Sequence, residues 1–299
     1  MRQLFIAGRR IADDDAPPFI IAELGHNHGG SVETCKRMIY VAHECGADAV
    51  KLQKRDNKTL YPTKMYNRPY DSEHAYGATY GEHREALEFG WDQYCELKEY
   101  SNELGIMFFA TAFDIPSANF LVRLGVPAIK IASGDLCNYP LLEHCAGPGI
   151  PLILSTGGHS MDDVWRTYLF LREHHVNYAF LQATAIYPAP HERLNLRVIE
   201  TYREAFPETV IGLSDHQDGI SMAPVAWMLG ARIFEKHFTL NRATKGSDNH
   251  FSLEPEQFRR MVNDLKGVIL ALGDGQKRAY PEEAPAMAKM KSILWRRDG

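Results

Sequence analysis

The sequence predicts an α/β fold, a (β/α)8 TIM barrel with an N-terminal β-hairpin and a long lid-like loop after the second strand. The first observation is a series of eight apolar runs of strand length. Each run is continuous rather than alternating, which is typical of parallel strands buried on both faces. The second observation is that stretches of helical length separate these runs. The 299-residue chain is long enough for one such domain.

The eight strand-like runs follow one another along most of the chain. They are residues 19–24, 49–53, 107–112, 128–132, 151–155, 178–184, 210–214 and 232–237. Eight is the number of strand–helix repeats that closes a barrel. A doubly wound open sheet is the alternative, and the absence of G-x-G-x-x-G after the first run weighs against it.

The segments between the runs predict the outer helices. In residues 31–45, apolar side chains recur at helical spacing, and Ser160 is a typical capping residue before two acids. Gly105 and Gly125 are typical helix terminators. Residues 254–272 predict the last helix of the ring.

The chain outside the repeats predicts three further parts. Residues 1–18 are expected to form a hairpin, with a turn at residues 8–10, that caps the N-terminal end of a barrel spanning 19–273. Residues 55–89 are too long for an ordinary barrel loop and are rich in Tyr, His and charge, which is typical of a lid or binding element. Residues 274–299 are polar and are expected to form a linker or tail.

Composition limits the partners and the compartment. The formal charge of −5 argues against a nucleic-acid or anionic membrane partner. No apolar segment is long enough to span a membrane, and the charged N-terminus does not resemble a signal peptide. The five cysteines show no C-x-x-C or framework spacing, so we expect reduced thiols in a cytoplasmic protein.

In a barrel, catalytic groups gather where the strands end, and the sequence places polar residues there. Lys51 and Lys130 lie inside otherwise apolar strands, where an ammonium group needs an anion or a partner. A salt bridge to Glu23 or Asp135 is the purely structural alternative. The other candidates at or after strand ends are Gln53, Thr111, Ser133, Ser155, Tyr187, Ser214, His216 and His237.

His216 and His237 each end a strand-like run, 21 residues apart, with one helix-length segment between them. Neighbouring parallel strands would bring both imidazoles to one rim, where they could hold a divalent metal ion. The alternative is a pair of structural imidazoles bonded to the backbone. Two cations and a ring of hydroxyls suit a ligand that carries phosphate and carboxylate, and the metal would polarise a carbonyl. This combination fits carbon–carbon bond formation between phosphoenolpyruvate and an aldehyde.

Seven phrases resemble the sialic acid synthase family, which condenses phosphoenolpyruvate with N-acetylmannosamine or related aldoses to make nonulosonic acids. The resemblance spans roughly residues 18–275. The phrases are IAELGHNHGG at 21–30, GADAVKLQ at 46–53, KIASG at 130–134, LSTG at 154–157, IYP at 186–188, GLSDH at 212–216 and EKHFT at 235–239.

The resemblance implies a phosphoenolpyruvate-dependent transferase that releases phosphate. His216 and His237 would hold Mn2+ or Mg2+, with Glu23 and Gln53 near the ion and the sugar's reacting end. Tyr187 and Asp248 would contact the acceptor. Phosphoenolpyruvate would be bound by Lys51, Thr111, Lys130, Ser133, Ser155 and Ser214. Family members are commonly dimeric, so we expect a homodimer.

The sequence departs from the family in two places. Ala185 stands where the family often has Asn or Ser near the phosphate. Members usually continue into a small antifreeze-like domain that contributes an arginine to the neighbouring acceptor site, whereas the sequence given ends at Gly299. We therefore expect the catalytic barrel alone, with residues 55–89 contributing to acceptor recognition.

Three other functions share features with this sequence. His26 and His28 resemble the first-strand H-x-H of amidohydrolases, but the histidines and aspartate that this scheme needs at later strands are absent from the sequence. The same condensation on another amino-sugar aldehyde, giving a legionaminic- or pseudaminic-type acid, stays open. So does a barrel that binds a sugar acid without turnover.

Overall fold

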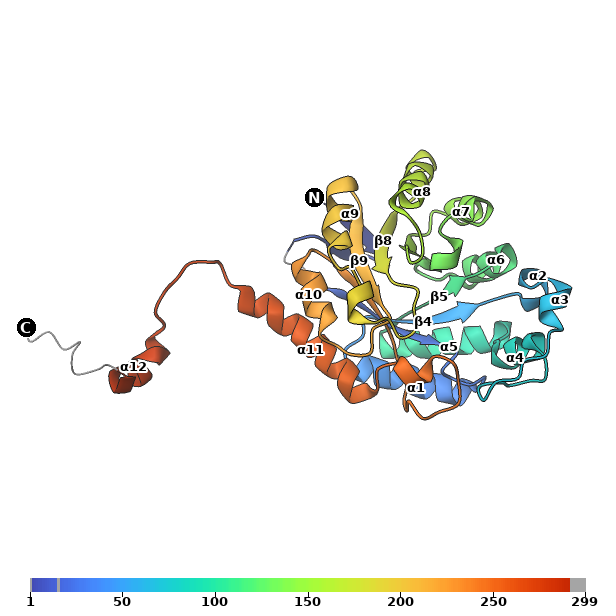
Figure 1. Cartoon of the computed structure of the whole chain (residues 1–299), viewed down its shortest axis with the longest axis horizontal. Coiled ribbons are helices and arrows are strands. Elements are labelled where there is room, and N and C mark those ends of the chain that lie inside the picture. The colour runs from blue at the N-terminus through green and yellow to red at the C-terminus, as the bar shows by residue number, and fades with distance from the viewer. Residues whose placement is uncertain (1, 15–16, 291–299) are drawn as a thin grey trace, which may run out of the picture.

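Eight parallel strands close into a barrel in the computed structural model, which describes residues 2–14 and 17–290 (Figure 1). Met1, residues 15–16 and residues 291–299 lie outside the described residues, and with them parts of the predicted hairpin and tail. The strands pair in the closed order β10-β3-β4-β5-β6-β7-β8-β9. Their bounds are β3 Phe19–Gly25, β4 Ala49–Lys54, β5 Met107–Ala112, β6 Ile129–Ile131, β7 Leu152–Ser155, β8 Tyr178–Ala183, β9 Val210–Asp215 and β10 Ile233–His237.

The predicted barrel is confirmed, and each strand lies within one or two residues of its predicted bounds. A helix follows every strand and covers the outside of the barrel (Figure 1). These helices are α1 Val32–Glu44, α5 Trp91–Leu104, α6 Ile115–Leu124, α7 Tyr139–Ala146, α8 Met161–Glu173, α9 Val198–Ala205, α10 Met222–Met228 and α11 Pro255–Leu272.

Local sequence explains where these helices begin and end. The Asp114 side chain accepts a hydrogen bond from the Ser117 amide and starts α6, and Ser160 caps α8 in the same way. Gly105 ends α5 with a φ of 77°, a left-handed conformation that glycine adopts without steric cost. Gly125 ends α6 in the same conformation, with a φ of 72°, so the helix ends predicted at Gly105 and Gly125 and the cap predicted at Ser160 are confirmed.

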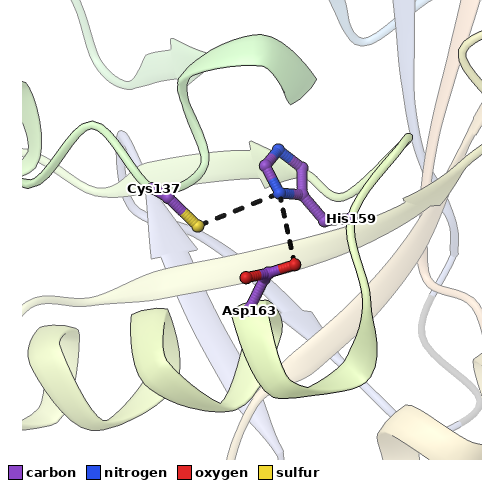
Figure 2. A group of neighbouring side chains, drawn as sticks. All are labelled: Cys137, His159 and Asp163. Carbon is purple, nitrogen blue, oxygen red and sulfur yellow. Dashed lines mark hydrogen bonds and ion pairs between the residues drawn. The ribbon is translucent and has the colours of Figure 1, made fainter.

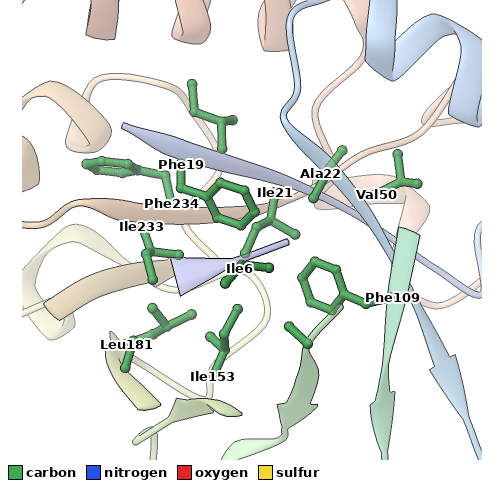
Figure 3. Close-up of a cluster of buried hydrophobic side chains, with 14 of the residues drawn as sticks. Ile6, Phe19, Ile21, Ala22, Val50, Phe109, Ile153, Leu181, Ile233 and Phe234 are labelled. Atoms are coloured by element: carbon green, nitrogen blue, oxygen red, sulfur yellow. The ribbon is translucent and has the colours of Figure 1, made fainter. Parts of the chain in front are cut away.

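The N-terminal hairpin, β1 Gln3–Ile6 and β2 Arg9–Ala12, is also confirmed. Its turn lies at Ala7 and Gly8, one to two residues earlier than predicted, because these residues adopt the positive φ values that a tight hairpin needs. Figure 3 shows Ile6 of β1 among apolar side chains that line the barrel, including Phe109, Ile153 and Leu181. Buried Ile6 thus packs with strand residues in the apolar interior of the barrel.

Residues 55–89 contain three short helices, α2 Asn57–Leu60, α3 Thr63–Tyr66 and α4 Tyr80–Leu87, which the prediction of a loop did not include. Asp56 caps α2, and Thr79 with Glu82 forms a capping box at α4. The Tyr76 hydroxyl donates to the Lys245 carbonyl, which lies beyond β10. The segment therefore reaches across the rim of the barrel to the loop that follows the last strand.

The chain continues beyond α11 in an exposed stretch that carries the 3-10 turn Pro281–Glu283 and the short helix α12 Ala284–Met290. Figure 1 shows α12 well away from the barrel. The boundaries 1–18, 19–273 and 274–299 stay predictions as domain limits. Among the described residues, none of the helices combines the length and the apolar character needed to cross a lipid bilayer.

Candidate active site

A cavity of about 560 Å³ opens at the carboxyl ends of the barrel strands. Residues at or just beyond the end of every strand line it, as the barrel architecture requires of a functional site. All twelve site residues predicted from sequence lie in its wall, although their roles stay predictions. They are Glu23, Lys51, Gln53, Thr111, Lys130, Ser133, Ser155, Tyr187, Ser214, His216, His237 and Asp248.

The two-residue period of a strand decides which side chains face this cavity. On β10, Glu235 and His237 line it, whereas Lys236 points away and forms an ion pair of 2.7 Å with Asp215 of β9. Lys236, which lies between Glu235 and His237 in the sequence, is thus neutralised by Asp215 outside the cavity. Only Glu235 and His237 on this strand face the cavity and can contribute to its chemistry.

Two carboxylates share the Lys51 ammonium group at one side of the cavity. Lys51 Nζ lies 2.5 Å from Glu23 Oε2 and 3.8 Å from Glu235 Oε1, and it donates to Thr111 Oγ1 at 2.9 Å. Burial raises the pKa of Glu23 to about 7. Burial opposes ionisation of Glu235 too, but the Lys51 and Lys130 ammonium groups lower its pKa. Glu235 is thus the ionised partner, and Glu23 exchanges a proton near neutral pH.

Gln53 fixes the orientation of Glu23. Its Nε2 donates to Glu23 Oε1 at 2.7 Å, and its own Oε1 accepts from Arg55 at 2.8 Å. Gly25 has a φ of 51°, and a Cβ there would lie 3.3 Å from Glu23 Oε1 and 3.4 Å from Gln53 Nε2. A side chain at Gly25 would therefore crowd this pair as well as strain the backbone.

Lys130 has a different environment, on β6, two strands along the barrel from Lys51. Its Nζ donates to Ser155 Oγ at 2.6 Å and to the Ile131 carbonyl at 2.8 Å, and no carboxylate of residues 2–14 or 17–290 forms an ion pair with it. Burial lowers the pKa of Lys130 to about 8. Nearby, Ser133 Oγ accepts from the Gly157 amide at 3.0 Å. A buried cation surrounded by hydroxyls and amides is a ready site for an anion.

The two predicted metal ligands are brought together on β9 and β10. The ring centroids of His216 and His237 lie 5.6 Å apart. Burial lowers the pKa of His216 to about 4 and also lowers that of His237, so both rings are neutral at pH 7. His216 Nδ1 donates to the Thr184 carbonyl at 2.8 Å, which leaves Nε2 with a free lone pair. His237 Nδ1 is buried without a hydrogen-bond partner in the described structure and lies 3.8 Å from Asp248 Oδ2.

These donors fit a divalent cation. A buried imidazole nitrogen without a partner is costly unless something binds it. Glu235 Oε2 is likewise buried without a hydrogen-bond partner among the described residues. Two neutral imidazoles with carboxylates nearby form a mixed nitrogen and oxygen donor set, which suits Mn2+ and, with more water ligands, Mg2+.

Tyr187 and Asp248 close the cavity above the histidines. The Tyr187 ring packs against the His216 ring with centroids 4.2 Å apart and a tilt of 39°, and Tyr187 is half exposed. Asp248 Oδ1 accepts from Ser247 at 2.7 Å. Both residues lie where an acceptor molecule would meet the histidine pair.

Among the ionisable residues that line the cavity, five were not among the predicted site residues: His26, Arg55, Arg84, His159 and Glu235. His26 lies between the two guanidinium groups, 3.4 Å from Arg55 and 3.3 Å from Arg84. Burial and these cations lower the pKa of His26 well below its ordinary range. A neutral imidazole has one lone pair, so it can accept from only one of the two arginines.

Sequence patterns indicate only some of these additional lining residues. Glu235 stands two residues before His237 on the same strand face, so the period of two would have found it. Arg55 and Arg84 belong to the segment that was expected to contribute to the acceptor site, and they are brought together by α4 and its loops. Sequence spacing of 29 residues gives no indication of that contact.

Comparison with known proteins agrees with this geometry. A model of the NeuB family matches residues 38–277. The N-acetylneuraminate-9-phosphate synthase of Mus musculus is 43% identical over 279 residues, which are 93% of this chain and 78% of that protein. The N,N'-diacetyllegionaminic acid synthase of Legionella pneumophila is 36% identical and is covered to 80%, with 94% of this chain.

A solved structure extends the match to three dimensions. The N-acetylneuraminic acid (sialic acid) synthetase of Leptospira borgpetersenii serovar Hardjo-bovis, crystallised in complex with citrate, aligns with a TM-score of 0.82 and 31% identity. The alignment covers 98% of each chain. The resemblance found in the seven sequence phrases is thereby confirmed, and the chain belongs to the NeuB family.

Proposed function

We propose that the protein condenses phosphoenolpyruvate with an amino-sugar aldose, such as N-acetylmannosamine, to form a nonulosonic acid and inorganic phosphate. The observation that carries the proposal is Lys130, a buried cation that contacts hydroxyl and carbonyl groups but, within residues 2–14 and 17–290, no carboxylate. It shares one cavity with the Glu23–Lys51 pair and the two histidines. The family relatives, which are named as synthases of sialic-type acids, support the same reaction.

Phosphoenolpyruvate would occupy the side of the cavity formed by β5, β6, β7 and β9. Lys130 and Lys51 would neutralise its phosphate and carboxylate, because charge-assisted hydrogen bonds are about twice as strong as neutral ones. Hydroxyl groups would orient the two anionic ends, and they are those of Thr111, Ser133, Ser155 and Ser214.

The aldose would lie above, with its aldehyde toward His216 and His237 and its remaining carbons toward Tyr187 and Asp248. A bound Mn2+ or Mg2+ on the two imidazoles would supply Lewis acidity at the aldehyde oxygen. C3 of phosphoenolpyruvate bonds to the aldehyde carbon, water adds at C2, and phosphate leaves by C–O cleavage. Glu23 exchanges the proton of these steps, because its pKa of about 7 allows both forms at neutral pH.

A phosphorylated aldose is a second candidate acceptor. Arg55 and Arg84 line the cavity, and neither forms an ion pair with a carboxylate in the part of the chain that the structure describes. Two guanidinium groups of that kind suit a phosphate. The relatives from Mus musculus and Homo sapiens are named for a 9-phosphate product, which would require phosphate on the terminal carbon of the aldose.

The deciding experiment is phosphate release from phosphoenolpyruvate with a panel of acceptors. The panel contains N-acetylmannosamine, its 6-phosphate and a diacetamido trideoxy sugar, each with and without a chelator. We expect release with at least one acceptor, loss of release on chelation, and recovery when Mn2+ or Mg2+ is returned. No release with any acceptor, while the metal is bound, would favour a barrel that binds a sugar acid without turnover.

The Arg84→Met variant separates the two acceptor classes. A charge-assisted hydrogen bond is worth about 1.5–3 kcal/mol, so the KM of a phosphorylated acceptor should rise roughly 10- to 150-fold. The KM of the neutral sugar should change little. Arg123→Met is the matched control, because Arg123 stacks on Trp91 outside the cavity. Equal changes for both acceptors would contradict a phosphate site at Arg84.

We also propose a homodimer in the cytoplasm. All five cysteines are free thiols, which suits a reducing compartment. Sedimentation of the purified protein tests the dimer, and fractionation of the source cells tests the location.

A further inference from the structure

Three side chains that take no part in the proposed reaction converge on the rim of the barrel (Figure 2), and one of them, His159, also lines the cavity. Cys137 follows the 3-10 turn Ser133–Asp135 after β6, His159 follows β7, and Asp163 lies in the first turn of α8. His159 Nδ1 lies 3.8 Å from Cys137 Sγ and 3.9 Å from Asp163 Oδ2. All three donor atoms lie within 4.8 Å of one another.

The hydrogen bond on the far side of the imidazole identifies what this group can do. His159 Nε2 donates to the Ser133 carbonyl at 2.8 Å, so Nε2 carries the proton and Nδ1 presents a lone pair to the cluster. In a catalytic thiol–imidazole–carboxylate triad, the thiol and the carboxylate contact opposite ring nitrogens. Here the Cys137 thiol and the Asp163 carboxylate both face Nδ1 of His159. The sulfur, nitrogen and oxygen atoms therefore converge on one point, as they do in a metal chelate.

The surroundings are also those of a metal site. Ligating imidazoles usually donate their other nitrogen to a carbonyl or carboxylate, and ligating carboxylates are themselves hydrogen-bonded. Asp163 Oδ2 accepts from the Ser160 amide at 3.0 Å and from the Ser160 hydroxyl at 2.7 Å. The side chains of His159 and Asp163 are 21% and 27% exposed, which leaves an entry path for an ion.

We propose that Cys137, His159 and Asp163 bind one Zn2+ ion at a site separate from the His216 and His237 pair. One thiolate, one imidazole and one carboxylate form a donor set that suits Zn2+ and leaves a fourth tetrahedral position open to water. The Cys137 thiol releases its proton to solvent when the sulfur–metal bond forms, so affinity rises with pH. Because the same imidazole holds the Ser133 carbonyl, the ion would also stiffen the loop that lines the phosphoenolpyruvate side of the cavity.

Cobalt absorption distinguishes the two metal sites. Co2+ is added to the reduced, metal-free protein, and Zn2+ is then added in competition. A thiolate ligand produces a charge-transfer band in the near ultraviolet, whereas the His216 and His237 site offers no sulfur. We expect this band in the wild type and in His237→Ala, its disappearance when Zn2+ displaces Co2+, and its absence from Cys137→Ser.

Two further variants act as checks on affinity and identity. Changing an outer partner of a ligand typically costs 10- to 100-fold in metal affinity, so loss of a ligand in His159→Gln or Asp163→Asn should weaken Zn2+ binding by at least ~100-fold. Asn keeps an acceptor for the Ser160 amide, so α8 retains its cap. Cys95→Ser is the matched control and should keep the band, because Cys95 is also partly exposed but lies in α5.

The proposal fails if the wild type shows no thiolate band, or if the band persists in Cys137→Ser. It also fails if Zn2+ leaves the rate of Cys137 alkylation by iodoacetamide unchanged, because a coordinated thiolate is protected. Circular dichroism melts of each variant establish that the fold is retained. These readouts need no turnover, so they stand apart from the test of the condensation reaction.

Discussion

Lys51 and Lys130 lie in the same cavity and are both buried, yet their surroundings differ in kind. Lys51 on β4 contacts the Glu23 carboxylate at 2.5 Å and has Glu235 at 3.8 Å, so its charge is balanced within the protein. In the described part of the chain, Lys130 on β6 contacts a hydroxyl and a carbonyl at these distances and no carboxylate. The charge of Lys51 is therefore balanced by carboxylates of the protein, and we call this part of the cavity the Lys51 side. The charge of Lys130 would be balanced by an anionic ligand, and we call that part the Lys130 side.

This difference predicts that Lys51 acts mainly on the stability of the fold, whereas Lys130 acts mainly on ligand binding. Removing one partner of a buried ion pair leaves the other charge stranded, which is strongly destabilising. Removing a buried cation that has no carboxylate partner relieves a desolvation cost. We therefore propose that the Lys130 ammonium serves in anion binding, and the substitutions below test that division.

Lys51→Met should have the largest effect. Glu23 and Glu235 would lose their shared cation, and breaking a buried pair in this way costs about 3–5 kcal/mol of the free energy of unfolding. Urea denaturation measures the change. Lys36→Met is the control, because the Lys36–Glu96 pair is partly exposed and should contribute less than about 1 kcal/mol. Equal losses in both variants would contradict a balanced charge cluster at Lys51.

Lys130→Met should act on binding instead. Loss of a charged hydrogen-bond donor would weaken phosphoenolpyruvate by about 2–3 kcal/mol, or roughly 30- to 150-fold in KM. The free energy of unfolding should stay level or rise, since an apolar side chain of similar length replaces the ammonium group.

Lys236→Met is the matched control for Lys130→Met. Lys236 is buried and paired with Asp215 but does not line the cavity. It should lose stability as Lys51→Met does and leave the KM of phosphoenolpyruvate unchanged in the protein that remains folded. If Lys130→Met lost as much stability as Lys236→Met, Lys130 would be a stabilising ion-pair residue like Lys51. This result would contradict the proposed difference between Lys51 and Lys130.

Most of this arrangement could be predicted from the sequence because strand burial and strand ends are local properties. Continuous apolar runs located all eight strands, and the placement of polar residues at their ends located twelve of the residues that line the cavity. Lys51 and Lys130 inside apolar strands indicate buried charges. The sequence does not show which of them has a carboxylate partner, because that depends on the register between neighbouring strands. Glu23 pairs with Lys51 because β3 and β4 are neighbours that align these two residues.

The remaining features depend on contacts between segments that no local pattern encodes. Thr79 and Glu82 form a readable capping box, so α4 was accessible from sequence, but the meeting of Arg84 with His26 and Arg55 was not. Cys137 and His159 lie on consecutive βα loops at no metal-motif spacing. The sequence predicts only that the cysteines are reduced thiols, and the fold is what places Cys137 beside an imidazole.

A pH series on Glu23→Gln tests the Lys51 side more finely. Burial raises the pKa of Glu23 from 4.5 to about 7, so its contribution to stability is fully present below pH 4.5 and is lost as the pH rises through 7. The stability of the wild type relative to Glu23→Gln should therefore fall by about 1–2 kcal/mol between pH 5 and pH 7 and then level off. Urea denaturation at each pH measures it, with exposed Glu103→Gln as the control. Parallel pH curves for the wild type and Glu23→Gln would show that Glu23 has an ordinary pKa.

Ala185→Asn should produce the smallest change, and it acts on the Lys130 side. Ala185 lines the cavity, and its amide nitrogen lies 3.2 Å from the position that a Cβ on Gly157 would occupy, beside Ser133. An amide side chain there could donate one neutral hydrogen bond to the phosphate, worth about 0.5–1.5 kcal/mol, which would lower the KM of phosphoenolpyruvate roughly 2- to 12-fold.

The neighbouring variant Ile186→Asn sets the baseline for Ala185→Asn, because Ile186 is exposed and does not line the cavity. It should leave the KM of phosphoenolpyruvate unchanged. An unchanged or higher KM in Ala185→Asn would mean that the hydroxyls and Lys130 already satisfy the phosphate, since an added donor without a free acceptor gains nothing. The charge and hydrogen-bonding groups on the Lys130 side would then all be satisfied once phosphoenolpyruvate is bound. Those on the Lys51 side are satisfied without a ligand.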